Sequence, residues 1–167
     1  QQYQFGSGGL ALSGTVVGEP QTLRLQSSAN FSYAAVDLTS TYHSTDVIAR
    51  PERSNLAVNH AEREFIFIKP LKTLVTLDRL DATSDGATKT FLLHFANSPT
   101  IAGNTATGVN GDQALKLTSL TSGSTFDVVN EGPNGQYRLE ENISGPAQSY
   151  MLNVMQAKGT SEPDLTV

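Results

Sequence analysis

Five side chains of types that bind sugars lie within about twenty positions of one another in this sequence. They are Tyr33, Tyr42, His43, Arg50 and Arg53. Aromatic faces cover the apolar C–H patches of a sugar, and arginine binds a carboxylate through a bidentate fork. These residues therefore predict a binding site for an acidic polysaccharide. A solvated scaffold is the competing interpretation, because aromatic residues at strand ends usually belong to the core and the chain has no tryptophan.

Tyr42 and His43 could also serve an elimination reaction on a uronic acid. Such a reaction needs a base, an acid for the leaving oxygen and a group that neutralises the carboxylate. Arg50 and Arg53 are near enough in sequence for the last of these roles. Adjacent side chains on an extended segment point in opposite directions, however. We therefore expect an ordinary polar loop at this place and no catalytic residue in this chain.

The candidate metal ligands are scattered through the sequence. His60, His94 and Asp78 form a nitrogen and oxygen set that zinc accepts, but they follow no fixed motif. Two segments rich in Asn, Asp and Gly, 84–88 and 104–112, offer oxygen atoms to calcium without the acidic spacing of a calcium loop. Turn formation explains these segments better, since Asn-Gly and Asp-Gly tolerate positive φ angles. We expect neither a metal nor a cofactor.

The composition limits the class of protein. The chain has 167 residues, a net charge of −5, 38% hydrophobic residues and 16% charged residues, which fits one folded domain. No run of Lys or Arg is long enough to neutralise phosphates, and no apolar run reaches the roughly 18 residues of a membrane span. Nucleic acids and membranes are therefore not expected as partners. The absence of cysteine excludes disulfides, thiolate metal sites and cysteine nucleophiles in these residues.

The clearest predicted elements are two strands, Glu62–Lys69 and Thr73–Leu80, joined by a tight turn that begins at Pro70. Apolar side chains occupy both faces of the first strand, so it is expected in the middle of a sheet that is covered on both sides. The mid-chain residues expected to be mostly buried are Phe65, Ile66, Phe67, Leu77, Leu92 and Leu93.

Further strands are expected on both sides of this hairpin. One begins at Phe31, and the others are Thr88–Ala96, Ala114–Leu120, Thr125–Val129, Gln136–Leu139 and Ser149–Ala157. We expect the first 22 residues to form a loop with one short edge strand at Thr15–Val17. Many short strands separated by Gly, Asn and Pro indicate an all-β fold, an antiparallel two-layer β-sandwich similar to a supersandwich. The Thr39–Asn55 loop is long and polar, so we expect it to carry the ligand contact.

Four consecutive segments have a familiar order and spacing: NFSYAAVDLTSTYH, EREFIFIKP, LVTLDRL and TFLLHF. They resemble the C-terminal β domain of heparinase II/III-like polysaccharide lyases. In that family a DLT…Y strand and loop precede an R-x-F-x-x-x-x-P strand, a V-x-x-D-R-V strand and a W/F-L-L-H strand. The resemblance covers roughly Phe31 to Phe95.

The resemblance implies a scaffold without the family's chemistry. The lyase reaction of that family involves a Tyr and His pair in and near an α-helical toroid, with a metal held by an H-x-H-x-D segment. This sequence contains no H-x-H and predicts no helical domain. The positions that match the family pattern are Asp37, Tyr42, Asp78, Arg79 and His94. By this resemblance they are scaffold residues of the sandwich.

We therefore expect a non-catalytic accessory β-sandwich domain of a bacterial extracellular polysaccharide-degrading protein, which binds an anionic polysaccharide or supports a catalytic neighbour. One alternative is the β-domain portion of a heparinase II/III-like lyase, acting by β-elimination on uronic-acid polymers, whose active site another chain or domain completes. A second alternative is a structural surface module. The opening QQYQFGSGG lacks the features of a signal peptide, so we expect a processed or excised piece of a larger secreted or periplasmic protein.

Overall fold

The structure, a computed structural model, describes residues 20–42, 57–132 and 136–164 of the chain. Within these residues the fold is all-β, with two antiparallel sheets that confirm the expected β-sandwich. No helix in the described ranges is long and apolar enough to cross a membrane.

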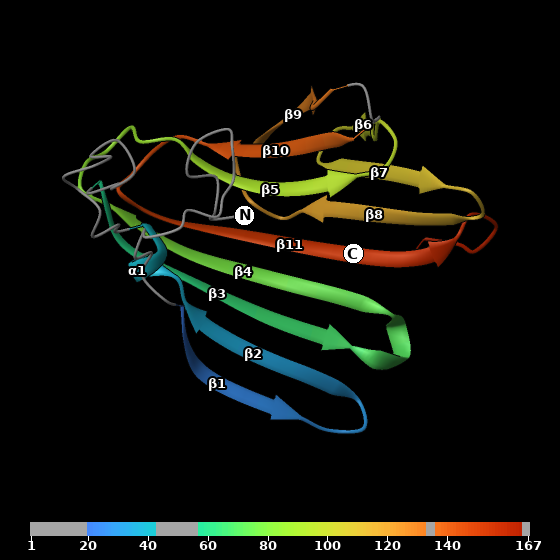
Figure 1. The fold of residues 1–167 in the computed structure, drawn as a ribbon, viewed down its shortest axis with the longest axis horizontal. Helices are drawn as coiled ribbons and strands as arrows, with labels where there is room; N and C mark the ends of the chain where they lie inside the picture. Colours follow the sequence, from blue (N-terminus) through green and yellow to red (C-terminus); the bar gives the residue numbers. More distant parts are fainter. Residues whose placement is uncertain (1–19, 43–56, 133–135, 165–167) are drawn as a thin grey trace.

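The larger sheet has eight strands and the smaller sheet has three (Figure 1). In spatial order the larger sheet contains β1 (Gln21–Ser27), β2 (Phe31–Asp37), β3 (Val58–Ile68), β4 (Thr73–Ala82), β11 (Gln148–Gly159), β8 (Gln113–Ser119), β7 (Thr105–Asn110) and β6 (Thr100–Ala102). The smaller sheet contains β5 (Lys89–Phe95), β10 (Tyr137–Ile143) and β9 (Thr125–Asn130). A short helix, α1 (Thr39–Tyr42), follows β2, and a 3-10 turn, Lys69–Leu71, connects β3 to β4.

The β3–β4 hairpin has the predicted pairing. Its strands are antiparallel neighbours in which Phe65 lies opposite Thr76. The turn ends at Lys72, whose φ of 48° lies in the left-handed region. A non-glycine residue is uncommon in this region, and here its backbone N–H bonds to the carbonyl oxygen of Lys69 and closes the turn. The predicted hairpin is therefore confirmed, together with its connection.

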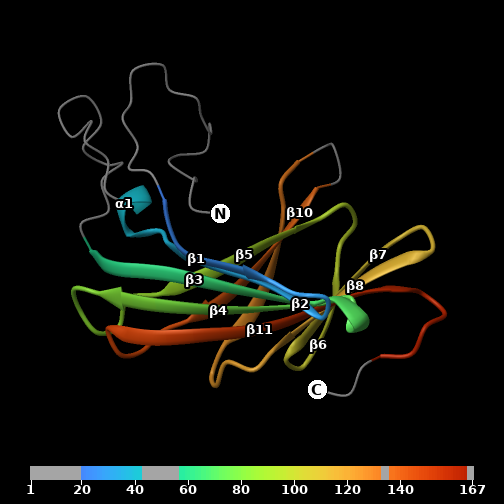
Figure 2. The same cartoon turned by 90° about the horizontal axis from the view of Figure 1, so that it is seen from below.

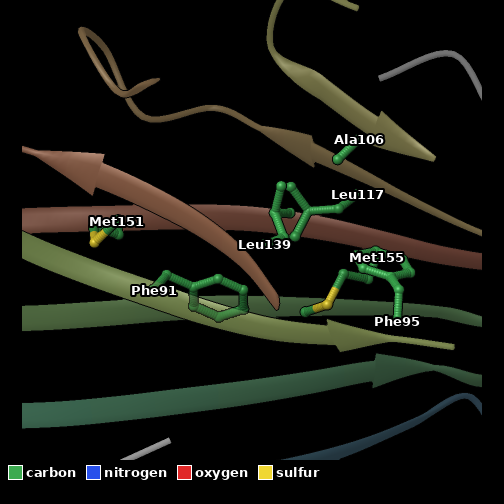
Figure 3. Close-up of a cluster of buried hydrophobic side chains, with 7 residues drawn as sticks. All are labelled: Phe91, Phe95, Ala106, Leu117, Leu139, Met151 and Met155. Atoms are coloured by element: carbon green, nitrogen blue, oxygen red, sulfur yellow. The ribbon is translucent and has the colours of Figure 1, made fainter. Parts of the chain in front are cut away.

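The hydrophobic core lies between the two sheets. Alternation along β11 directs Met151 and Met155 toward the smaller sheet, which contributes Leu139 from β10. We call the face of the eight-stranded sheet that carries these methionines the inner face, and the opposite one the outer face. Figure 3 shows the buried cluster, made of Phe91, Phe95, Ala106, Leu117, Leu139, Met151 and Met155.

The smaller sheet covers only part of the inner face. In Figure 1 it lies over the half of the large sheet that contains β11, β8 and β7, while β1 and β2 extend beyond it. It reaches β3 only in part, where Phe91 of β5 lies against Arg63. The expectation that β3 is covered on both sides is therefore wrong. Ile66 is 36% exposed on one face and Phe67 is 40% exposed on the other. The other residues expected to be mostly buried, Phe65, Leu77, Leu92 and Leu93, are each less than 36% exposed without being fully enclosed.

The remaining predicted strands correspond to β2, β5, β8, β9, β10 and β11, whereas β1, β6 and β7 were not predicted. Strand β7 lies in the segment 104–112, which was expected to be turn alone. The turn explanation holds at Gly86 and Gly111, which have φ angles of 81° and 62°. The expected edge strand at Thr15–Val17 lies outside the described residues.

Candidate ligand-binding groove

A shallow groove lies on the uncovered part of the inner face, over β1, β2 and β3. Its volume is about 410 Å³, and most of its surface is apolar. It is lined by Leu25, Gln26, Ser27, Ser32, Tyr33, Ala34, Phe65 and Phe67. A concave apolar surface with a few polar groups is the usual form of a small-ligand site. We call this the inner groove.

The hollow follows from the sizes of side chains that face each other across three strands. On the middle strand, β2, the inner-face residues are Ser32 and Ala34, which are small. Phe65 and Phe67 flank them on β3, in register with Ala34 and Ser32 respectively. Leu25 stands opposite Ala34 on the other side, on β1. Large residues on both outer strands and small ones between them leave a trough along β2.

A positive charge lies beside the inner groove, next to its lining residue Ser27. The Lys69 ammonium donates to the Ser27 hydroxyl at 3.2 Å and to the carbonyl oxygen of Ser28 at 2.6 Å. The Ser27 and Ser32 hydroxyls are in turn 3.1 Å apart. Among the described residues no carboxylate pairs with Lys69. The groove thus combines aromatic carbon, hydroxyl groups and a cation whose charge no described carboxylate balances.

Arg63, one step along β3 from Phe65 on the inner face, is held by the fold. Its Nη2 donates to Asp78 Oδ2 at 2.7 Å, and its Nε donates to the other oxygen of that carboxylate. The guanidinium carbon lies 4.8 Å from the centre of the Phe91 ring. Burial acts to lower the pKa of Arg63, but the Asp78 carboxylate outweighs it and the pKa is raised. Arg63 therefore stays charged and is not free to bind a ligand.

The structure does not bring the two described tyrosines of the sequence prediction together. The Tyr33 ring lies on the outer face, where its hydroxyl donates to Glu64 Oε2 at 2.8 Å and only its strand contributes to the groove. This hydrogen bond raises the pKa of Tyr33. Tyr42, at the end of α1, is near enough to Arg63 to act on its charge, and Arg63 is an inner-face residue. Figure 2 shows α1 on the same side of the large sheet as β10.

The other three members of the predicted sugar site, His43, Arg50 and Arg53, lie outside the described residues, as does most of the Thr39–Asn55 loop. The described part of that loop forms α1. The Asp37 carboxylate accepts a hydrogen bond from the Thr39 N–H at 2.8 Å at the start of this helix, and bonding to Thr39 lowers the pKa of Asp37. Asp37 thus orders the beginning of the loop.

The histidines of the metal hypothesis have separate partners. His60 Nε2 lies 3.5 Å from Glu62, and Nε2 of His94, on β5 of the smaller sheet, lies 3.0 Å from Glu131, which follows β9. Asp78 is engaged by Arg63. In the parts of the chain that the structure describes, no group of three or more acidic, histidine or cysteine side chains is placed to hold a metal. The three candidate ligands therefore do not form one site.

Sequence reasoning missed the residues that shape the inner groove. Phe65 and Phe67 were expected in the core, and Lys69 was assigned only to a strand end. The available signal was the two-residue alternation that aligns Ser32 and Ala34 with these phenylalanines. Reading it required the register between β2 and β3, which are separated by a loop and do not form a tight hairpin.

Comparison with solved structures supports the fold assignment. A heparan sulfate lyase HepC from Pedobacter heparinus superposes with a TM-score of 0.53 and 12% identity over 87% of this chain. A heparinase III with methylated lysines gives 0.58 and 12% over 86%, and another heparinase III gives 0.53 and 9% over 85%. The chain spans only 22% of the length of each. No protein-family model and no curated protein sequence matches it.

Proposed function

We propose that this chain is a non-catalytic β-sandwich domain of an extracellular polysaccharide-degrading protein and that it binds an acidic polysaccharide in the inner groove. The observation that carries the proposal is the position of Phe65 and Phe67 beside Lys69, a cation that no described carboxylate neutralises. Aromatic rings suit the apolar faces of sugar rings, and the ammonium suits a carboxylate or sulfate group.

The balance of interactions favours an elongated ligand that contacts both parts of the groove. Covering the exposed part of the Phe67 ring would contribute on the order of 1 kcal/mol, since full burial of such a side chain contributes about 1.5–3 kcal/mol. An exposed ion pair with Lys69 would add at most about 1 kcal/mol and would weaken with salt. Each contact is small, so affinity must come from several sugar units together.

The likeness to heparinases supports this choice of ligand class. The neighbours are named for heparan sulfate and for heparinase III activity, and this chain shares the fold of about a fifth of each. Because this chain matches only 22% of each neighbour, the likeness also fits a rival function. In that function the chain is a β-domain of a lyase whose active site another domain or chain completes. In that case this chain alone would bind its polymer weakly and would catalyse nothing.

The test is calorimetry of the chain with heparin, with alginate and with a neutral glucan. We expect heparin and alginate to bind, with affinity that falls as salt rises, and Phe67→Ala and Lys69→Ala each to weaken binding about threefold to fivefold. Lys72→Ala is the matched control, because Lys72 is exposed beside the same turn and its ammonium lies 3.8 Å from Glu162.

Three results would contradict the proposal. Equal binding by the wild type, Phe67→Ala and Lys69→Ala would remove the groove from the function. Salt-independent binding to the neutral glucan would remove the acidic ligand. A steady rise in ultraviolet absorbance from unsaturated product, abolished by Tyr42→Phe, would show that the chain is itself a lyase.

A further inference from the structure

The outer face of the large sheet carries an apolar surface that no described element covers. In a two-layer sandwich the outer residues are normally polar, because they face water. Here adjacent strands β3, β4 and β11 present aliphatic side chains side by side. This outer patch consists of Ile66, Val75, Leu77, Leu152 and Val154. The smaller sheet packs against Met151 and Met155 on the inner face, so it does not cover this patch.

The register makes the outer patch continuous. Val75 of β4 lies between Ile66 of β3 and Val154 of β11, and Leu77 lies opposite Leu152 in the next outward-facing row. Tyr150, 62% exposed, extends the patch along β11. Ile66 is exposed, and the other four residues of the patch are partly exposed. A contiguous apolar surface within reach of water marks an interaction site more often than a solvated face.

The two ends of the outer patch have opposite charge. At the end near Tyr150 the outer-face carboxylates of Asp37, Glu62, Glu64 and Asp81 outnumber two guanidinium groups, those of Arg24 and Arg79. Arg79 donates to Glu64, so it neutralises part of this charge only. At the other end Lys72, Lys116 and Lys158 outnumber Glu162 and Asp164. The patch is therefore apolar in its middle, acidic at one end and basic at the other.

We propose that the outer patch is the interface of a homodimer, in which two copies of this chain stack their large sheets face to face. A surface with an apolar centre and ends of opposite charge is complementary to itself after a two-fold rotation. The dimer buries the patch of both copies and leaves both inner grooves open on its outside, so it does not depend on what the groove binds.

Charge selects one orientation of the dimer. A two-fold axis that runs along the strands would place acidic end on acidic end, which like charges disfavour. An axis in the interface and perpendicular to the strands instead places the acidic end of each copy over the basic end of the other. This second axis is the arrangement that the proposal requires. It leaves each strand over the same strand of the other copy, so Glu62 and Asp81 of one copy lie near Lys72, at the β3–β4 turn, and Lys158, on β11, of its partner.

Sedimentation velocity over a wide concentration range tests the apolar part. We expect a monomer–dimer equilibrium that Ile66→Glu weakens at least tenfold. Val128→Glu is the matched control, because Val128 is also 36% exposed and β-branched but lies on β9 of the smaller sheet. It should leave the equilibrium unchanged. A wild type that stays monomeric at every concentration, or equal weakening by both substitutions, would overturn the proposal.

Charge reversal tests the orientation with a readout that misfolding cannot imitate. The double variant Glu62→Lys, Asp81→Lys and the double variant Lys72→Glu, Lys158→Glu should each be mostly monomeric alone, because in each of them like charges oppose one another across the interface. Mixed together they should restore a dimer of wild-type affinity within a few-fold, since both contacts become attractive again. Monomers in the mixture, with both variants folded by circular dichroism, would reject this interface. Full dimerisation of each variant alone would reject it as well.

Discussion

Replacing Asp78 with asparagine should destabilise the fold strongly, because Arg63 and Asp78 form an ion pair that is largely withdrawn from water. Only 18% of the Arg63 side chain and 4% of the Asp78 side chain are exposed. Removing one partner of such a pair costs about 3–5 kcal/mol, since the remaining charge is left without compensation. Asparagine keeps the size of the side chain and one acceptor, so we expect about 3 kcal/mol for Asp78→Asn.

A loss of about 3 kcal/mol is a large part of the free energy of unfolding of a domain. The free energy of unfolding of a single domain is about 5–15 kcal/mol. For a chain of this length, each 1 kcal/mol of lost stability lowers the melting temperature by about 2–4 °C. Asp78→Asn should therefore lower it by about 10 °C. Urea denaturation followed by circular dichroism measures the free energy directly, with an unchanged slope if the unfolded state is not altered.

The outer face offers an internal control on the same two strands. Arg79 of β4 pairs with Glu64 of β3, but the Arg79 side chain is 47% exposed. Exposed pairs contribute at most about 1 kcal/mol, so Arg79→Met should cost no more than that. If Asp78→Asn and Arg79→Met have the same small effect, burial does not govern the strength of these pairs and the reasoning fails.

Two further predictions concern packing and pH. A Cβ atom on Gly108 would lie 2.1 Å from Cδ1 of Phe95 in the core. Gly108→Ala should therefore lower the free energy of unfolding by about 1–3 kcal/mol. A variant as stable as the wild type would contradict this prediction. Hydrogen bonds from Lys116 and Lys158 lower the pKa of Asp164 to about 2. Because this pKa is depressed, the stabilisation is complete above the ordinary value of 3.8 and is lost as pH falls toward about 2. Asp164→Asn should flatten the pH dependence of stability in that window, and an unchanged slope would exclude the contribution.

The strands that sequence reasoning predicted are those with a strong local signal. The β3–β4 hairpin has alternating apolar residues and a short turn, and β5 and β11 have long apolar alternations. Strand β1 was missed because it buries nothing: all seven of its residues are exposed, so no apolar face marks it. Strand β7 was missed because Gly108 and two threonines interrupt its apolar pattern.

The candidate site was harder to predict than the fold. Tyr33 and Tyr42 are close in sequence, but the alternation of β2 sends Tyr33 to the outer face while α1 approaches Arg63 on the inner side. The error about Ile66 and Phe67 has a related cause. Apolar residues on both faces of a strand were taken to mean two covering layers. The smaller sheet reaches β3 at Arg63 but leaves Phe67 exposed on the inner face, and no described element covers Ile66 on the outer face. How far a covering layer extends is a property of the whole fold, which local sequence does not encode.

The position of β1 at the end of the sheet gives the inner groove two walls of different stiffness. Phe65 and Phe67 stand on β3, which is hydrogen-bonded on both sides, by β2 and β4. Leu25 stands on β1, which pairs with β2 alone and has a register shift near its start. Strands with one partner and little burial open at a lower free energy than central ones. A polymer lying along β2 would thus rest its sugar faces against a fixed aromatic wall, while the leucine wall yields to side groups of different bulk. Such a groove tolerates an irregular pattern of substituents along a chain and selects mainly for the shape of the ring that repeats.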